Sequence, residues 1–249
     1  MVTTQEIKKY ARSVGVAETG IISLERLRTL PTGDVEDTKT LRGASEELPS
    51  VRSAIVLGYL VKDGILNVMS REPSLGDGVG DRWGAEFHQL YGEIAMNKAW
   101  MVADHLRRLG YEARPSNSIA LKRAAVLSGL GRQGKNTVVI SPVHGPRLRF
   151  SSVLTSAELE PDEPYTVDLC RDCDVCVRAC PTKALRPYEI DIKRCMVYAS
   201  ENPGSDKVKD DVRELERRMI KRPTPNSFLE CTICLDACPL GREKNADLE

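Results

Sequence analysis

The eight cysteines of this 249-residue sequence are the residues best suited to chemistry, and all of them follow residue 169. The first four are spaced C-x2-C-x2-C-x3-C and are followed by a proline; they are Cys170, Cys173, Cys176 and Cys180. Bacterial ferredoxins use this spacing to hold cubane iron–sulfur clusters through thiolates. The other four repeat the pattern with the first cysteine displaced upstream; they are Cys195, Cys231, Cys234 and Cys238. Two complete sets of four thiolates predict two 4Fe–4S clusters.

The same spacing predicts which cysteines share a cluster. In two-cluster ferredoxins the fourth cysteine of each motif ligates the cluster of the other motif. We therefore expect cluster 1 to be bound by Cys170, Cys173, Cys176 and Cys238, and cluster 2 by Cys180, Cys195, Cys231 and Cys234. This crossing would hold the two clusters close together for electron transfer. Disulfides and structural zinc are the alternatives. They are disfavoured because zinc sites usually use paired C-x2-C knuckles and nothing marks a secreted protein.

The composition sets limits on compartment and partners. Lys and Arg together number 36, as do Asp and Glu, so net charge gives no general attraction to nucleic acid or membranes. The N-terminus has no apolar leader, and no apolar run reaches membrane-spanning length. We expect a cytoplasmic protein without membrane contact, since thiolates must stay reduced until iron is loaded. The cysteine-free stretch predicts a first domain over residues 1–158 and a cluster domain over 159–249.

Hydrophobic spacing predicts a mixed α/β fold (α+β, with a mixed sheet) for the first domain, and the cysteine motifs predict a ferredoxin-like double-cluster domain after it. Residues 53–59 are almost continuously apolar, which is typical of a strand buried on both faces. A long helix is predicted over 86–109, because apolar residues recur at helical spacing and Gly110 ends it. Shorter elements are expected as helices at 4–14, 120–127 and 206–221 and as strands at 20–24, 137–140 and 150–155.

The stretch between residues 105 and 150 is strongly basic. Its only acidic residue is Glu112, and its basic residues are Arg107, Arg108, Arg114, Lys122, Arg123, Arg132, Lys135, Arg147 and Arg149. Such a stretch forms either a solvated face or a wall for a phosphate-bearing cofactor or substrate. The glycines beside Lys135 and Asn136 favour the second interpretation, because bare backbone lets a ligand approach closely.

Residues 123–140, which read RAAVLSGLGRQGKNTVVI, followed by a strand, an acidic linker and C-x2-C-x2-C-x3-C-P, resemble the epoxyqueuosine reductase family, relatives of the reductive dehalogenases. The strand at 51–59, the segment 82–88 and the lone Cys195 before the second motif are also similar. The resemblance covers most of residues 5–243.

The resemblance implies a cobalamin-dependent reductase in which the clusters deliver electrons to a corrinoid that removes oxygen or halide from an organic substrate. The proton-donating acid of the family falls on Glu86, where epoxyqueuosine reductases have aspartate. Glutamate keeps the acid chemistry but reaches about one methylene further. Asp77 and Asp81 are alternative acids. The expected cofactor-binding residues are Tyr59, Arg82, His88, Gly129, Gly131, Gly134, Lys135, Asn136 and Thr137.

The expected partners are a small-molecule or modified-nucleoside substrate and an external low-potential electron donor of ferredoxin or flavodoxin type. The family usually continues into a helical-repeat tail that helps to hold tRNA, whereas this sequence stops at Glu249, so tRNA is a weaker expectation. Two alternatives stay open at this point. One is an electron carrier or reductive activator without a substrate of its own, and the other is a reductase with flavin in place of the corrinoid.

Overall fold

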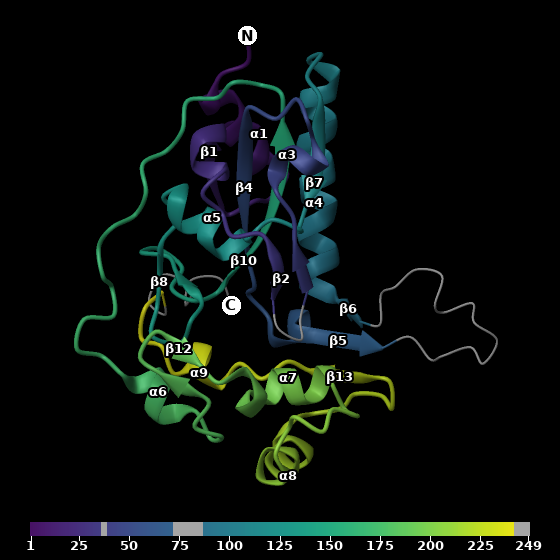
Figure 1. The fold of residues 1–249 in the computed structure, drawn as a ribbon, viewed down its shortest axis with the longest axis vertical. Helices are drawn as coiled ribbons and strands as arrows, with labels where there is room; N and C mark the ends of the chain where they lie inside the picture. The colour runs from purple at the N-terminus through teal and green to yellow at the C-terminus, as the bar shows by residue number, and fades with distance from the viewer. Residues whose placement is uncertain (36–38, 72–86, 242–249) are drawn as a thin grey trace, which may run out of the picture.

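A four-stranded sheet forms the centre of the computed structural model, which describes residues 1–35, 39–71 and 87–241 (Figure 1). Its strands are β1 (Glu18–Ser23), β4 (Ser53–Leu60), β10 (Leu148–Thr155) and β7 (Ala113–Ser116), in the order β1-β4-β10-β7. Every neighbouring pair is antiparallel. The strand predicted from the apolar run at 53–59 is thus confirmed as the buried β4, and the mixed α/β fold class is confirmed with it.

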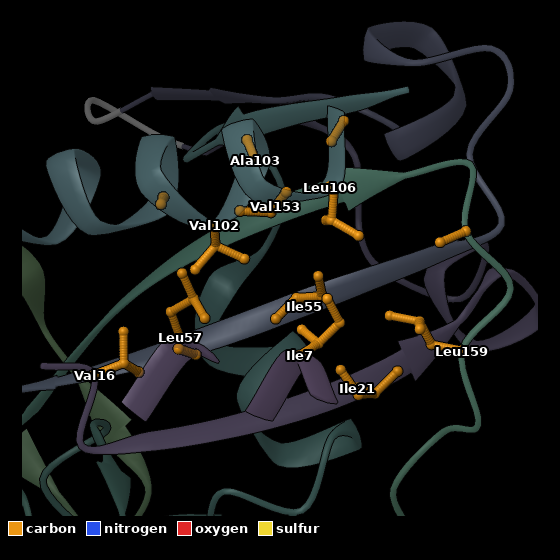
Figure 2. Close-up of a cluster of buried hydrophobic side chains, with 14 residues drawn as sticks. Ile7, Val16, Ile21, Ile55, Leu57, Val102, Ala103, Leu106, Val153 and Leu159 are labelled. Carbon is orange, nitrogen blue, oxygen red and sulfur yellow. The ribbon is translucent and has the colours of Figure 1, made fainter. Parts of the chain in front are cut away.

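Helices cover both faces of this sheet because β4 alternates its side chains between two apolar clusters. Ile55 and Leu57 point into a cluster that contains α1 (Thr4–Ser13) and α4 (Leu90–Arg108), as Figure 2 shows. Ala54 and Val56 point into the opposite cluster, which contains α5 (Leu121–Leu127). Successive side chains of a strand point to opposite faces of the sheet. Because the consecutive residues 54–57 of β4 are all apolar, both of its faces are buried.

The N-terminal part contains several shorter elements. They are α2 (Leu24–Leu27), β2 (Gly33–Val35), β3 (Lys39–Leu41), α3 (Ala44–Glu47), the 3-10 helix η1 (Gly64–Asn67), β8 (Arg132–Gln133) and β9 (Val139–Ile140). The strand predicted at 137–140 is shorter than expected, because the Thr137 N–H donates to the Gly134 carbonyl at 2.9 Å and closes a turn there. None of the helices in the described part of the chain is both long and apolar enough to cross a bilayer.

A second, three-stranded sheet joins the two parts of the chain. Its order is β13-β5-β6, with β5 (Val68–Arg71) and β6 (Phe87–Gln89) from the N-terminal part and β13 (Ser227–Leu229) from the cluster region. The prediction of a helix from residue 86 is wrong at its start. Residues 87–89 pair with β5 instead, so α4 begins only at Leu90.

The cluster region contains short helices and one hairpin. They are α6 (Val175–Ala179), β11 (Leu185–Arg186), β12 (Glu189–Ile190), the 3-10 helix η3 (Ile192–Arg194), α7 (Met196–Glu201), α8 (Asp210–Met219) and α9 (Ile233–Asp236). α6 and α9, which carry the two similar cysteine motifs, pack against each other. A long segment connects β10 to α6 along the outside of the molecule (Figure 1). The domain boundary at 158/159 stays a prediction.

The charged helix expected between Cys195 and Cys231 is α8, and one buried carboxylate fixes it to α7. Glu216 is 3% exposed, accepts a 2.8 Å hydrogen bond from the Ser200 hydroxyl and is paired with Arg222. The buried Glu216 carboxylate thus has both of its partners only when α8 packs on α7 in this orientation.

Replacing this carboxylate should therefore destabilise the fold. Glu216→Ala leaves the buried Ser200 hydroxyl without its partner and should cost about 2 kcal/mol, which corresponds to a fall in Tm of about 4–8 °C. Glu214→Ala on the same helix is the control, because its ion pair with Arg218 is exposed and is worth at most about 1 kcal/mol. Differential scanning calorimetry of anaerobic protein measures both; equal Tm values for the two variants would contradict this account.

Candidate functional site

A cavity of about 1270 Å³ lies between the N-terminal part and the cluster region. One wall comes from α5, the turn at 132–139 and β10; the other comes from residues 180–197 and 230–235. The volume is larger than the roughly 300–1,000 Å³ typical of small-molecule pockets. Part of this volume is the space between the cluster-2 cysteines, and the part that extends to α5 and β10 has room for a further large ligand.

All four cysteines expected to bind cluster 2 lie on the cavity wall. They are Cys180, Cys195, Cys231 and Cys234. The set expected for cluster 1 has a different position, with Cys176 and Cys238 buried and Cys173 exposed at the surface. None of the eight cysteines forms a disulfide. One set is thus placed against the cavity and the other has a member facing solvent.

The electrostatic neighbours of the thiols fall largely into the same two sets, with one neighbour across them, Cys176 beside Cys234. Burial raises the pKa of Cys176, and Cys170, Cys238 and Cys173 raise it further. Burial likewise raises the pKa of Cys231 to about 11, with Cys195 and Cys180 adding to the rise. Iron binds the thiolate form, so loading such protonated thiols must release protons. The grouping matches the crossed scheme, whose ligation itself stays a prediction.

Two of the expected cofactor residues, Asn136 and Thr137, line the cavity. Asn136 is 3% exposed, and its Nδ2 finds no hydrogen-bond partner among the described residues. Thr137 has a φ of 64°, a left-handed conformation that β-branched residues rarely adopt. Strain and an unpaired buried donor at one turn are typical of a ligand-binding position.

Lys135, by contrast, faces the cluster 1 loop. Its ammonium donates to the Arg171 carbonyl at 2.6 Å, and its backbone N–H donates to Cys170 Sγ at 3.5 Å. Hydrogen bonds to cluster sulfurs are one of the factors that set reduction potential. Lys135 is not among the described cavity-lining residues, and its role in binding the cofactor stays a prediction.

The three glycines of this segment are required by internal packing. A Cβ on Gly129 would lie 2.6 Å from the Glu163 carbonyl oxygen, and one on Gly134 would lie 2.5 Å from Ile140 Cγ1. A Cβ on Gly131 would collide with the Ile140 carbonyl, and its φ of 154° is strained for other residues. The packing of the chain on itself therefore accounts for the bare backbone, and contact of these glycines with a cofactor stays a prediction.

The remaining expected site residues lie away from this cavity or outside the described residues. Tyr59 is on β4, with the Lys98 ammonium 5.8 Å from the centre of its ring, and it is not among the described cavity-lining residues. His88 is on β6, with Nδ1 3.6 Å from a carboxylate oxygen of Glu93. Arg82 and Glu86 lie outside the described residues, as do the alternative acids Asp77 and Asp81.

The basic stretch divides between two environments. Lys122, Arg123, Arg132 and Arg149 line the cavity. Arg107 and Arg114 instead make local hydrogen bonds: Arg107 donates to the Ala113 carbonyl, and Arg114 donates to the Glu47 carbonyl. The prediction of one continuous basic wall is therefore too broad, and about half of the stretch reaches the cavity.

Sequence reasoning missed a cluster formed by Tyr91, Arg149 and Glu230, all of which line the cavity. The Arg149 guanidinium carbon lies 5.0 Å from the centre of the Tyr91 ring, and its Nη2 lies 3.7 Å from Glu230 Oε2. Burial raises the pKa of Glu230, and Arg149 opposes this rise. The acid directly before Cys231 was the available signal, because a charge beside a cluster ligand is rarely incidental.

Comparison with known proteins connects these features. Residues 169–241 match the family described as 4Fe-4S double cluster binding domain. The epoxyqueuosine reductase of Bacillus subtilis (strain 168) is 24% identical over 98% of this chain, which spans 65% of that protein. A tetrachloroethene reductive dehalogenase of Desulfitobacterium hafniense is 38% identical over 44% of this chain and 21% of its own length. The double-cluster domain is therefore established, and this chain spans under two thirds of these two relatives.

Solved structures show the same fold. The epoxyqueuosine reductase of Streptococcus thermophilus superposes with a TM-score of 0.68 at 20% identity, covering 97% of this chain and 67% of that one. An epoxyqueuosine reductase solved with a modified tRNA stem loop also has a TM-score of 0.68, at 20% identity, over 96% of this chain and 65% of that one. A reductive dehalogenase described with a mechanism for B12-dependent dehalogenation has a TM-score of 0.60 at 20% identity, over 97% and 33%.

The crossed ligation can be tested by removing one cysteine from each motif. Cys180→Ala should damage cluster 2 and Cys238→Ala cluster 1, so that iron per chain falls from about eight toward about four in each variant. Iron analysis and EPR spectra of the reduced variants measure this, and the two spectra should differ because different clusters remain. Eight irons retained in both variants would contradict the scheme.

Proposed function

Taking the homology of this chain to the epoxyqueuosine reductases as the premise, we propose that it is a corrinoid-dependent iron–sulfur reductase that removes oxygen or halide from an organic substrate. One observation carries this proposal most directly: four cysteines of the double-cluster domain line a cavity of about 1270 Å³. An electron carrier without a substrate has no need of such a cavity beside its clusters, so the enzyme is favoured.

The described residues fit a corrinoid in three respects. The cavity is large, and its lining is mostly apolar, with Val126, Val139 and Phe150 among the wall residues. Two buried polar atoms, Asn136 Nδ2 and Glu230 Oε2, have no hydrogen-bond partner among the described residues. A corrinoid offers apolar ring edges, amide groups and a phosphate, and Lys122 and Arg123 on the wall suit the phosphate.

The chain's own residues would bind the corrinoid, orient the substrate and hold the clusters close to both. When bound, the corrinoid would supply the low-valent cobalt that breaks the carbon–oxygen or carbon–halogen bond. Residues 1–158 would hold the corrinoid and substrate, and residues 159–249 would hold the clusters. Cys173 faces solvent, so we place the docking point of a ferredoxin- or flavodoxin-type donor there, and the whole reaction in the cytoplasm.

For the substrate we propose a small molecule or a modified nucleoside. The epoxyqueuosine reductase solved with a tRNA stem loop supports the nucleoside class for the family. Lys122, Arg123 and Arg132 at the cavity would suit an anionic substrate as well as the phosphate of the cofactor. We therefore keep tRNA as a candidate partner.

Loss of the unpaired donor should weaken corrinoid binding. Asn136→Leu removes Nδ2 at nearly constant volume and should raise the Kd for cobalamin about tenfold. Asn202→Leu is the control, because the Asn202 amide bonds the Tyr198 carbonyl outside this cavity. Anaerobic absorption titration of cluster-loaded protein measures both affinities. The same Kd for Asn136→Leu and the wild-type protein would remove Asn136 from the binding site.

We further propose that Glu86 supplies the proton. Glu86→Gln should lose turnover at least about a hundredfold while iron content and cobalamin affinity stay unchanged. The assay needs only a reducible model substrate, such as a chlorinated phenol, with a chemical reductant. A Glu86→Gln protein that turns over normally would leave Asp77 and Asp81 as the acids to examine.

A further inference from the structure

Tyr91, Arg149 and Glu230 meet on the cavity wall from three separate elements. Tyr91 lies in the first turn of α4, Arg149 lies on β10 and Glu230 follows β13. The side chains of Arg149 and Glu230 are only 16% and 14% exposed. A charged pair that is buried to this degree beside a cavity needs further partners, because burial raises the cost of every unpaired polar atom.

The fold, and not chance contact, brings these residues together. In the three-stranded sheet, Gln89 of β6 pairs with Met69 and Leu229 of β13 pairs with Val68, so both strands leave the sheet at the same end of β5. Tyr91 comes two residues after Gln89, and Glu230 comes directly after Leu229. Arg149 reaches them from the main sheet, opposite Tyr59 in the register of β10 with β4.

One atom of the cluster is left without a hydrogen bond. Glu230 Oε2 is buried, and no described residue lies within hydrogen-bond distance of it as a donor. The Tyr91 hydroxyl and the Arg149 guanidinium both stabilise the charged carboxyl, with Arg149 Nη2 3.7 Å from Oε2, beyond hydrogen-bond distance. The unpaired oxygen belongs to a cavity-lining side chain. It therefore indicates a ligand group that can donate a hydrogen bond.

The charges around Glu230 Oε2 indicate which kind of ligand group can bind there. A cationic ligand group would be repelled by Arg149, and an anionic group would be repelled by Glu230. A neutral group that donates to Glu230 and accepts from Arg149 satisfies both. We propose that Glu230 and Arg149 bind a primary carboxamide of the ligand that fills the cavity, with its N–H on Glu230 Oε2 and its carbonyl on the Arg149 guanidinium.

This inference rests on the proposed function, because a corrinoid carries primary carboxamides around its ring. A substrate with an amide group is the other source of the same chemistry. Tyr91 supports the site by stacking under Arg149, which keeps the guanidinium in place.

The test compares two corrinoids on cluster-loaded protein. Dicyanocobinamide carries the primary carboxamides, whereas the heptamethyl ester of dicyanocobyrinic acid carries esters, which accept hydrogen bonds but donate none. Glu230→Leu should raise the Kd of the cobinamide about tenfold and leave the Kd of the ester within about twofold.

Glu230→Gln, which keeps an acceptor, should restore most of the cobinamide affinity. Glu201→Leu is the matched control, because Glu201 is a nearby half-buried acid that is not among the described cavity-lining residues.

A second arm separates the corrinoid from the substrate as the source of the amide. Benzamide and methyl benzoate are titrated into the cobinamide-loaded wild-type protein and into Glu230→Leu. If cobinamide affinity does not depend on Glu230 but benzamide binding does, the amide belongs to the substrate and the proposal stands. Iron content of each variant reports whether it is folded.

Two results would overturn the proposal, and they differ from failure of the proposed function. Equal losses for the amide and ester ligands in Glu230→Leu would show that Glu230 acts only on the shape of the cavity. No dependence on Glu230 in either arm would remove it from binding altogether. A wild-type protein that binds no cobinamide would instead overturn the proposed function, and this inference with it.

Discussion

The pairing of β13 with β5 is the contact on which the site depends. It is the sheet contact that ties the cluster region to the N-terminal part, and it fixes the backbone immediately before Cys231. The cavity wall at 230–235 follows directly from this strand, while β6 on the other side of β5 leads into α4. The strand pairing therefore fixes the cysteine ligands and the cavity wall relative to each other. An electron-transfer site requires this, because a bound cofactor and the cluster must keep a fixed separation.

Around this junction the structure concentrates features that a stable fold alone does not need. Thr137 has a left-handed backbone, and two buried atoms, Asn136 Nδ2 and Glu230 Oε2, have no hydrogen bond from the part of the chain that the structure describes. Each of them costs free energy in the protein alone. They border the same cavity, so one large ligand with amide and phosphate groups could satisfy them together. Under the proposed function, the corrinoid is that ligand.

Local patterns in the sequence predicted the fold class, the buried strand β4 and the cysteine sets, because spacing along one segment determines each of them. The three-stranded sheet could not be predicted in this way. Its strands are three or four residues long and come from segments far apart in the sequence. They form because these segments pair in the folded chain, and local propensity does not predict them. That sheet is also what moved the start of α4 and brought Tyr91 to Glu230. For the same reason the packing role of the three glycines could not be predicted, because only the folded chain brings Ile140 beside Gly131.

The most direct test of the account is metal analysis of the wild-type protein after anaerobic incubation with cobalamin and removal of the excess. The account predicts about one cobalt for about eight irons per chain, with the absorption of a bound corrinoid added to that of the clusters. Eight irons without cobalt would contradict the account, because the cavity beside the cysteines would then serve another ligand; a yellow chromophore isolated with the protein would identify that ligand as a flavin.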